Sequence, residues 1–112
     1  RQDEGESSLK CAKRELLEET GLASEDWELW YEQEPYGKME WTVSRYIARN
    51  CKKVSEQKLD VGEKIEVKPV SFDEFIRIMI EEDSRSQDVT FEILRMHYKN
   101  ELDNFKQRLF KK

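Results

Sequence analysis

A cluster of acidic residues at helical spacing is the feature that most restricts what this chain can fold into. Glu18 and Glu19 stand three and four residues after Glu15, directly behind Arg14, in the run from Glu6 to Leu22. On a helix these side chains share a face, where like charges repel one another. A divalent cation relieves that repulsion, and Mg²⁺ prefers hard oxygen ligands. The run therefore predicts a helix that carries a cation site.

Several positions of this run match a known signature in one register. Seven residues separate Glu6 from Arg14, and the matching residues are Glu6, Arg14, Glu15, Leu16, Glu18, Glu19, Gly21 and Leu22. The run resembles the Nudix box, the signature of the Nudix hydrolases, which here spans residues 1–22 without its opening glycine. The resemblance implies an α/β fold, an α/β/α sandwich with a mixed sheet. Strands normally precede the box, so we expect residues 1–112 to form a single domain whose N-terminal strands are missing.

Composition narrows the function classes. The chain has 112 residues, enough for one domain with a modest core, and a net charge of −5. The acidic balance argues against a nucleic-acid partner, and no apolar run is long enough to predict a membrane segment. Cys11 and Cys51 lack the spacing of metal ligands. We interpret them as reduced thiols of a cytoplasmic protein rather than as a disulfide.

Hydrophobic periodicity and turn residues predict helix, strands, helix, helix along the chain. Ser7 or Ser8 is the expected N-cap of the first helix, and Gly21, which can take a positive φ, is its expected C-terminal stop. The later expected elements are strands over 27–33, 41–48 and 64–70, a polar loop over 50–62, a helix from the capping box at 71–74 to Glu82, and a last helix capped by Asp88. The apolar stripe of the last helix comprises Phe91, Leu94, Tyr98, Leu102, Phe105 and Leu109.

The resemblance implies roles for the box residues. Nudix hydrolases cleave a nucleoside diphosphate linked to another group X, with divalent metals that neutralise phosphate and activate water. Glu15 and Glu19 are expected to bind one metal, and Glu18 to help with a second. Arg14 is expected to orient a box glutamate through paired hydrogen bonds, and Glu6 to support the same network or to reach the metal through water. The alternative is a solvated helix face.

A second candidate lies before the third expected strand. Glu63 follows Gly62 and resembles the loop glutamate that ligates metal or acts as general base in Nudix enzymes similar to ADP-ribose pyrophosphatases. The alternative is an ordinary loop acid. Asp60 and Glu66 compete for the role, and Glu66 is the weaker candidate because it lies inside the expected strand.

The predicted activity is therefore Mg²⁺-dependent hydrolysis of the pyrophosphate bond of a nucleoside diphosphate linked to X, with Mn²⁺ as a substitute metal. The favoured substrate is ADP-ribose or a nucleotide sugar, and triphosphates and dinucleoside polyphosphates stay open. The alternative is a noncatalytic Nudix-fold binding module or an inactive fragment. The stripe of the last helix also suits a homodimer, which is common in this branch of the family, as well as packing on its own sheet.

Other residues are weaker candidates. Arg45 and Arg49 could pair with phosphate, although a surface position on a strand is the favoured interpretation of both. His97 is the single histidine, so the sequence offers little basis for a nucleophile activated by histidine.

Overall fold

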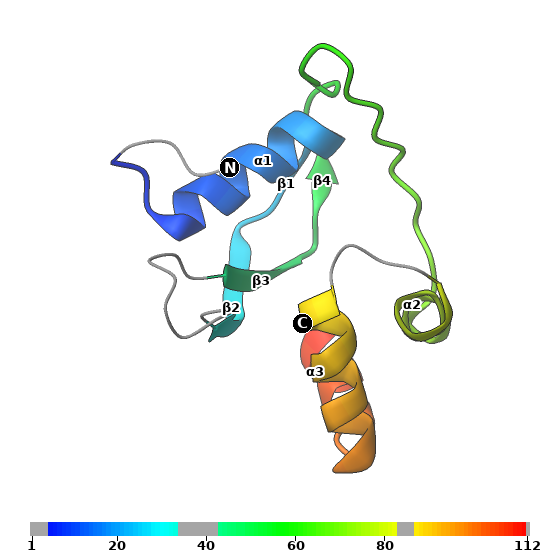
Figure 1. Ribbon diagram of the computed structural model, residues 1–112. Coiled ribbons are helices and arrows are strands. Elements are labelled where there is room, and N and C mark those ends of the chain that lie inside the picture. Colours follow the sequence, from blue (N-terminus) through cyan, green and yellow to red (C-terminus); the bar gives the residue numbers. More distant parts are fainter. Residues whose placement is uncertain (1–4, 34–42, 83–86, 112) are drawn as a thin grey trace. The chain divides into compact units, whose positions relative to one another are not determined.

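The computed structural model describes residues 5–33, 43–82 and 87–111, which fall into two compact units, residues 1–67 and 68–112 (Figure 1). Helices and strands are both present, as the predicted α/β class requires. In the first unit the elements are α1 (Ser8–Thr20), β1 (Leu22–Ala23), β2 (Asp26–Gln33), β3 (Val43–Arg49) and β4 (Lys52–Lys53). In the second unit they are α2 (Phe72–Glu81), α3 (Gln87–Tyr98) and α4 (Leu102–Leu109).

Both ends of α1 follow the local chemistry of the sequence. The Ser7 hydroxyl accepts a hydrogen bond from the backbone N–H of Lys10, which satisfies a donor that a helix start leaves without a partner. Gly21 ends the helix at φ +74° and donates its N–H to the Leu17 carbonyl. The helix packs on β1 and β3, and a hydrogen bond of 2.6 Å joins the hydroxyls of Ser8 and Tyr46. The prediction for this helix is confirmed.

Both described strand pairs are antiparallel. β2 pairs with β3 from Asp26 opposite Arg49 to Gln33 opposite Val43, with an irregularity at Trp30, and β1 pairs with β4. The predicted strand 27–33 is confirmed almost to the residue. For the predicted strand 41–48, residues 43–48 are confirmed, while 41 and 42 lie outside the described residues.

The predicted strand over residues 64–70 is wrong. The segment is extended, but none of its residues enters a sheet, and the boundary between the two units falls inside it. Its alternation of polar and apolar residues predicted a strand, yet a strand also needs a partner for its backbone groups. Val67, on the apolar side of the segment, keeps 43% of its surface exposed, so that side is only partly covered.

The helix predicted from the capping box is confirmed. The Ser71 hydroxyl accepts a hydrogen bond of 3.1 Å from the backbone N–H of Glu74, and α2 runs to Glu81. The carboxylate of Glu74 pairs with Arg77 instead of returning to the cap. In the same unit, the Thr90 hydroxyl donates to the Met79 carbonyl and ties α3 to α2.

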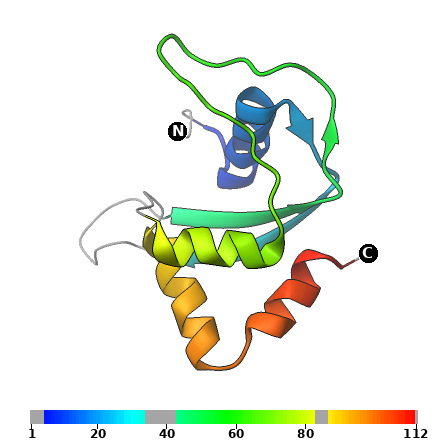
Figure 2. The ribbon, with the colours of Figure 1, turned by 90° about the vertical axis from the view of Figure 1, so that its right-hand side faces the viewer.

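The prediction of a single long last helix is also wrong, because α3 and α4 together occupy the span predicted for it (Figure 2). At the break Asn100 has φ +58°, and its N–H and that of Glu101 reach back to the carbonyls of His97 and Met96. This is a Schellman ending, in which a left-handed residue stops the helix. Asp88 lies in the first turn of α3 rather than ahead of it.

The predicted apolar stripe of that helix is only partly correct. Phe105 is buried, as the stripe requires, but Phe91 and Tyr98 are 64% and 88% exposed. The buried side of α3 is formed by Val89, Ile93 and Met96 instead. The difference arises within α3 itself, because its buried residues follow steps of four and three from Val89, on another face of the helix than Phe91 and Tyr98.

Candidate active site

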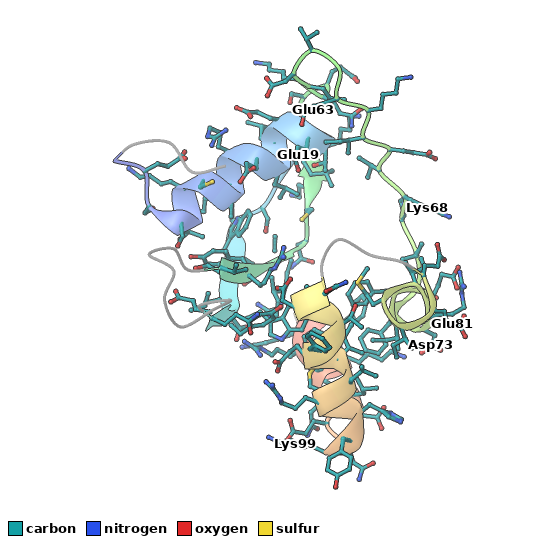
Figure 3. All side chains as sticks on the ribbon, in the orientation of Figure 1. Glu19, Glu63, Lys68, Asp73, Glu81 and Lys99 are labelled. Carbon is teal, nitrogen blue, oxygen red and sulfur yellow. The ribbon has the colours of Figure 1, made fainter. Side chains whose placement is uncertain are left out.

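The acidic residues of α1 and a loop after β4 line one cavity of about 430 Å³. Figure 3 labels Glu19 on α1 and Glu63 on that loop, close to each other in the same unit. The lining residues are Arg14, Glu15, Glu18, Glu19, Lys58, Asp60 and Glu63. The structure therefore brings together all the residues predicted to bind metal, although Glu63 is far from the α1 acids in sequence.

Arg14 organises the acids on its own side of the helix. Its Nε and Nη2 donate to the two carboxylate oxygens of Glu6 at 3.0 and 3.2 Å, and its Nη1 donates to Glu18 at 3.1 Å. The paired contact with Glu6 fixes the plane of the guanidinium. The Glu6 side chain is only 15% exposed and does not line the cavity, so it supports the site by pairing with Arg14. One arginine thus connects the loop before α1 with the acids on the helix.

Glu63 lies in a tight turn that its own carboxylate stabilises. Its backbone N–H donates to the Asp60 carbonyl at 3.0 Å, and its Oε1 accepts the Asp60 N–H at 2.6 Å. Gly62 takes φ +88°, which favours glycine, and so allows the turn. Both competing acids can now be placed: Asp60 lines the cavity beside Glu63, whereas Glu66 is exposed and lies outside the lining.

The acids differ in how well their charges are compensated. Burial raises the pKa of the Glu19 carboxyl, and the negative charges of Glu15 and Glu63 raise it further. For Glu15 burial acts in the same direction, but hydrogen bonds, including one from the Cys11 thiol, and the charge of Arg14 outweigh it and lower the pKa. Of these two acids, Glu19 is therefore the one whose negative charge is less well compensated.

Cys11 is a buried thiol that touches this network. Its Sγ donates to Glu15 Oε1 at 2.9 Å, and burial raises its pKa to about 11, with the nearby carboxylate adding to the effect. The thiol therefore stays protonated near neutral pH and acts as a donor to Glu15. Cys51 is exposed, and both cysteines are free, as predicted.

The donor set suits a hard divalent cation. The cavity lining has five carboxylates against two basic side chains, and burial together with the charges of Glu15 and Glu63 raises the pKa of Glu19. Among residues 5–33, 43–82 and 87–111, no three acidic, histidine or cysteine side chains are already gathered into a metal-binding group. Mg²⁺ does not require such a group, because it is usually held by one or two carboxylates together with water and phosphate oxygens. The chemistry of the lining therefore fits the ion.

Sequence reasoning missed three residues that take part in this site. Cys11 stands four residues before Glu15, so helical spacing alone could have placed it beside that acid. Lys58 lines the cavity, and Gln57 contacts the last turn of α1, but both lie in a loop without periodicity. Arg49 was misplaced: it is buried, not a surface residue, and pairs with Asp26 and Glu28.

Comparison with known proteins identifies the family. No curated protein matches the chain. None of the helices in the described part of the chain has the length and apolar character needed to cross a membrane. The family model of the NUDIX domain matches residues 1–91, which include the box, the loop with Glu63 and α2. The mixed α/β structure is consistent with the Nudix fold, and the predicted fold class is confirmed. The chain belongs to the NUDIX family.

Proposed function

We propose that this chain is a Mg²⁺-dependent Nudix hydrolase that cleaves the pyrophosphate bond of a nucleoside diphosphate linked to X. Membership of the family implies this type of reaction in general. The observation that carries the proposal for this chain is the shared cavity, in which the acids of α1 face Glu63 and Asp60 of the loop. A solvated helix face does not account for a loop acid lying opposite the helical acids.

The proposed roles follow from position and charge. Glu15 and Glu19 would hold one cation, and Glu18 and Glu63 would hold a second, with Mn²⁺ able to replace Mg²⁺. Such a cation, when bound, neutralises phosphate oxygens and lowers the pKa of the attacking water. Arg14 orients Glu18 through the bond from Nη1, and Glu6 fixes Arg14.

Glu63 is also the residue on which the proposed substrate class rests. It lies on a loop after Gly62 and lines the cavity with Glu19. This place resembles that of the loop glutamate of Nudix enzymes similar to ADP-ribose pyrophosphatases. As a second cation ligand or as general base, Glu63 would act from the wall of the cavity that it lines. We therefore propose ADP-ribose or a nucleotide sugar as the substrate. The single-domain organisation of residues 1–112 is part of the same proposal.

We also propose a homodimer and a cytoplasmic location. The exposed Phe91 and Tyr98 of α3 support the first, because large aromatic side chains favour contact with another protein. The free thiols of Cys11 and Cys51 support the second, since reduced cysteines are usual in the cytoplasm. Light scattering coupled to size-exclusion chromatography measures the oligomeric state.

Product analysis tests the activity. The chain is incubated with ADP-ribose and other nucleotide diphosphate compounds, with and without Mg²⁺, and products are measured by mass spectrometry. We expect Mg²⁺-dependent release of AMP and a sugar phosphate. Absence of turnover with every compound, from protein shown to be folded, would favour the noncatalytic binding module.

Two loop variants test the assignment of the loop acid. Glu63→Gln should lower turnover more than Asp60→Asn, because only Glu63 is proposed to act on the cation or the water. The two acids line the same cavity and belong to one turn, in which the Asp60 backbone N–H donates to the Glu63 carboxylate, so each variant is a control for the other. If Asp60→Asn lowered turnover more than Glu63→Gln, Asp60 rather than Glu63 would be the loop acid that acts on the cation or the water.

A further inference from the structure

The loop after β4 supplies hydrogen bonds to the C-terminal end of α1. A helix leaves its last four carbonyls without partners inside the helix. The backbone N–H of Gly21 donates to the Leu17 carbonyl. From the loop, the backbone N–H of Lys58 donates to the Glu18 carbonyl at 2.7 Å, and Gln57 Nε2 donates to the Glu19 carbonyl at 2.6 Å. The loop is therefore attached to the same turn that carries two acids of the proposed metal site.

The Gln57 amide makes a second bond, from Nε2 to the Ile65 carbonyl at 2.9 Å. Both partners are backbone carbonyls, which only accept, so both hydrogens of the amide group are used and its orientation is fixed. One side chain thus joins three places: the last turn of α1 and the two ends of the segment 57–65.

The part of the loop enclosed by these bonds carries Lys58, Asp60 and Glu63, which all line the cavity. The tip of the loop has little packing to hold it. Val61 is fully exposed, and nothing lies within 4 Å of the position that a Cβ at Gly62 would take. The internal bonds between Glu63 and Asp60 shape the turn but do not attach it to the helix.

We infer that Gln57 is a positioning residue that sets the place of Glu63 relative to Glu18 and Glu19. This inference rests on the proposed function for its effect on turnover. Gln57 is not one of the residues that line the cavity, so it acts by fixing the loop on the helix. The Lys58 backbone bond holds one side of the loop whatever the side chain at 57, whereas the tie to Ile65 depends on the Gln57 amide.

The test replaces Gln57 with methionine, which has a similar length but no hydrogen to donate. The control is Ser7→Ala, which removes the cap at the other end of α1 and leaves the loop bonds intact. A merely structural role predicts that both variants lose stability and keep the Mg²⁺ dependence of the wild type. A positioning role predicts that Gln57→Met alone lowers kcat, by about tenfold to a hundredfold, and raises the Mg²⁺ concentration needed for half-maximal rate.

A double variant shows whether Gln57 acts through Glu63. If it does, adding Gln57→Met to Glu63→Gln should lower kcat much less than Gln57→Met lowers it in the wild type. Full additivity of the two effects, or a wild-type Mg²⁺ dependence in Gln57→Met, overturns the inference while leaving the proposed function intact.

Hydrogen exchange separates the inference from the proposed function. In metal-free protein, Gln57→Met should speed amide exchange over residues 58–65 at least tenfold, whereas Ser7→Ala should not. If the wild type shows neither turnover nor Mg²⁺ binding, the proposed function fails, and this measurement alone decides whether Gln57 holds the loop. Unchanged exchange over 58–65 overturns the inference in either case.

Discussion

Glu19 has the least favourable electrostatic environment of the acids on α1. Arg14 compensates Glu18 through a direct bond, and hydrogen bonds together with the charge of Arg14 favour the ionised form of Glu15. For Glu19, burial and the neighbouring acids both raise the pKa. The charge of this residue therefore opposes folding in the absence of a cation. The same charge favours a cation that enters the cavity.

The sign of this effect can be tested by Glu19→Gln in metal-free protein. An acid whose pKa is raised on folding leaves the fold most stable below its unfolded pKa of about 4.3, and stability falls as pH rises through the folded pKa. Glutamine stays neutral, so the variant should melt at a higher temperature than the wild type at pH 7, and the gap should close near pH 4. Thermal melts over this pH range measure it.

The control for this comparison is Glu32→Gln, at an exposed position on β2. It should leave the pH dependence of melting close to that of the wild type. Glu19→Gln should also abolish Mg²⁺-dependent turnover, because the amide cannot replace a carboxylate ligand. A lower melting temperature for Glu19→Gln at pH 7 would make Glu19 a structural residue and contradict its assignment to the metal site.

Gly21 is needed for two separate reasons, and a second glycine allows them to be separated. Gly21 and Gly5 both have φ +74°, but a Cβ at Gly21 would collide with the backbone oxygen of Ser55, whereas a Cβ at Gly5 meets nothing within 4 Å. Gly5→Ala should cost about 1 kcal/mol of folding free energy from backbone strain alone. Gly21→Ala should cost roughly 1–3 kcal/mol more, because the loop must move.

Chemical denaturation of the two alanine variants measures that difference. Equal losses would mean that the loop does not approach Gly21 as closely as the structure shows. The collision point lies in the loop whose residues 54 and 55 donate to the Gly21 carbonyl. The glycine of the box therefore does more than end a helix: it leaves room for the loop that brings Glu63 to the acids of α1.

The residues of the site divide by the kind of signal that they leave in the sequence. The acids of α1 could be grouped from the sequence because helical spacing puts them on one face, whereas Glu63 is singled out by its resemblance to a loop glutamate of related enzymes. Gln57 leaves no such signal. A side-chain amide that bridges two backbone carbonyls depends on where the chain returns in space, which neither spacing nor composition encodes.

At the scale of elements, the same distinction separates correct from wrong predictions. α1 and α2 are predictable because capping residues and periodicity act within a few residues. The alternation of polar and apolar residues over 64–70 predicts an extended chain with one polar and one apolar side. It does not tell whether another strand lies beside that chain to pair with it. The break between α3 and α4 depends on one residue, Asn100, and its left-handed conformation competes with a continuous helical pattern on both sides.

The helix break can be tested at Asn100. Glycine adopts φ +58° easily, so Asn100→Gly should change the folding free energy by only a few tenths of a kcal/mol. Asn100→Ala should destabilise by about 1 kcal/mol, since alanine is strained there. If α3 and α4 were one continuous helix, alanine would stabilise it and glycine would weaken it by about 1 kcal/mol. Denaturant titration of the three proteins, with circular dichroism, decides between these orders.

At the scale of the whole molecule, the two units have different relations to function. The first, residues 1–67, holds every residue of the proposed site, and its cavity gathers five of the acids of a chain whose net charge is −5. The match to the NUDIX domain runs through this unit and ends within α3 of the second. A cation should therefore act on the stability of the first unit, where these acids gather.

Mg²⁺ should stabilise the protein by specific binding rather than by screening. A ligand that binds only the folded state adds about 2.7 kcal/mol at a hundred times its Kd. We expect thermal melts of the wild type to shift upward with MgCl₂, and to shift much less with NaCl at equal ionic strength, because screening acts on all exposed charges. Glu63→Gln should retain part of the shift, since the acids of α1 remain, whereas Glu15→Gln combined with Glu19→Gln should lose it. An equal response to both salts, or an unchanged Mg²⁺ shift in the double variant, would show that the α1 acids do not bind the cation. Either result would contradict the proposed metal-dependent mechanism.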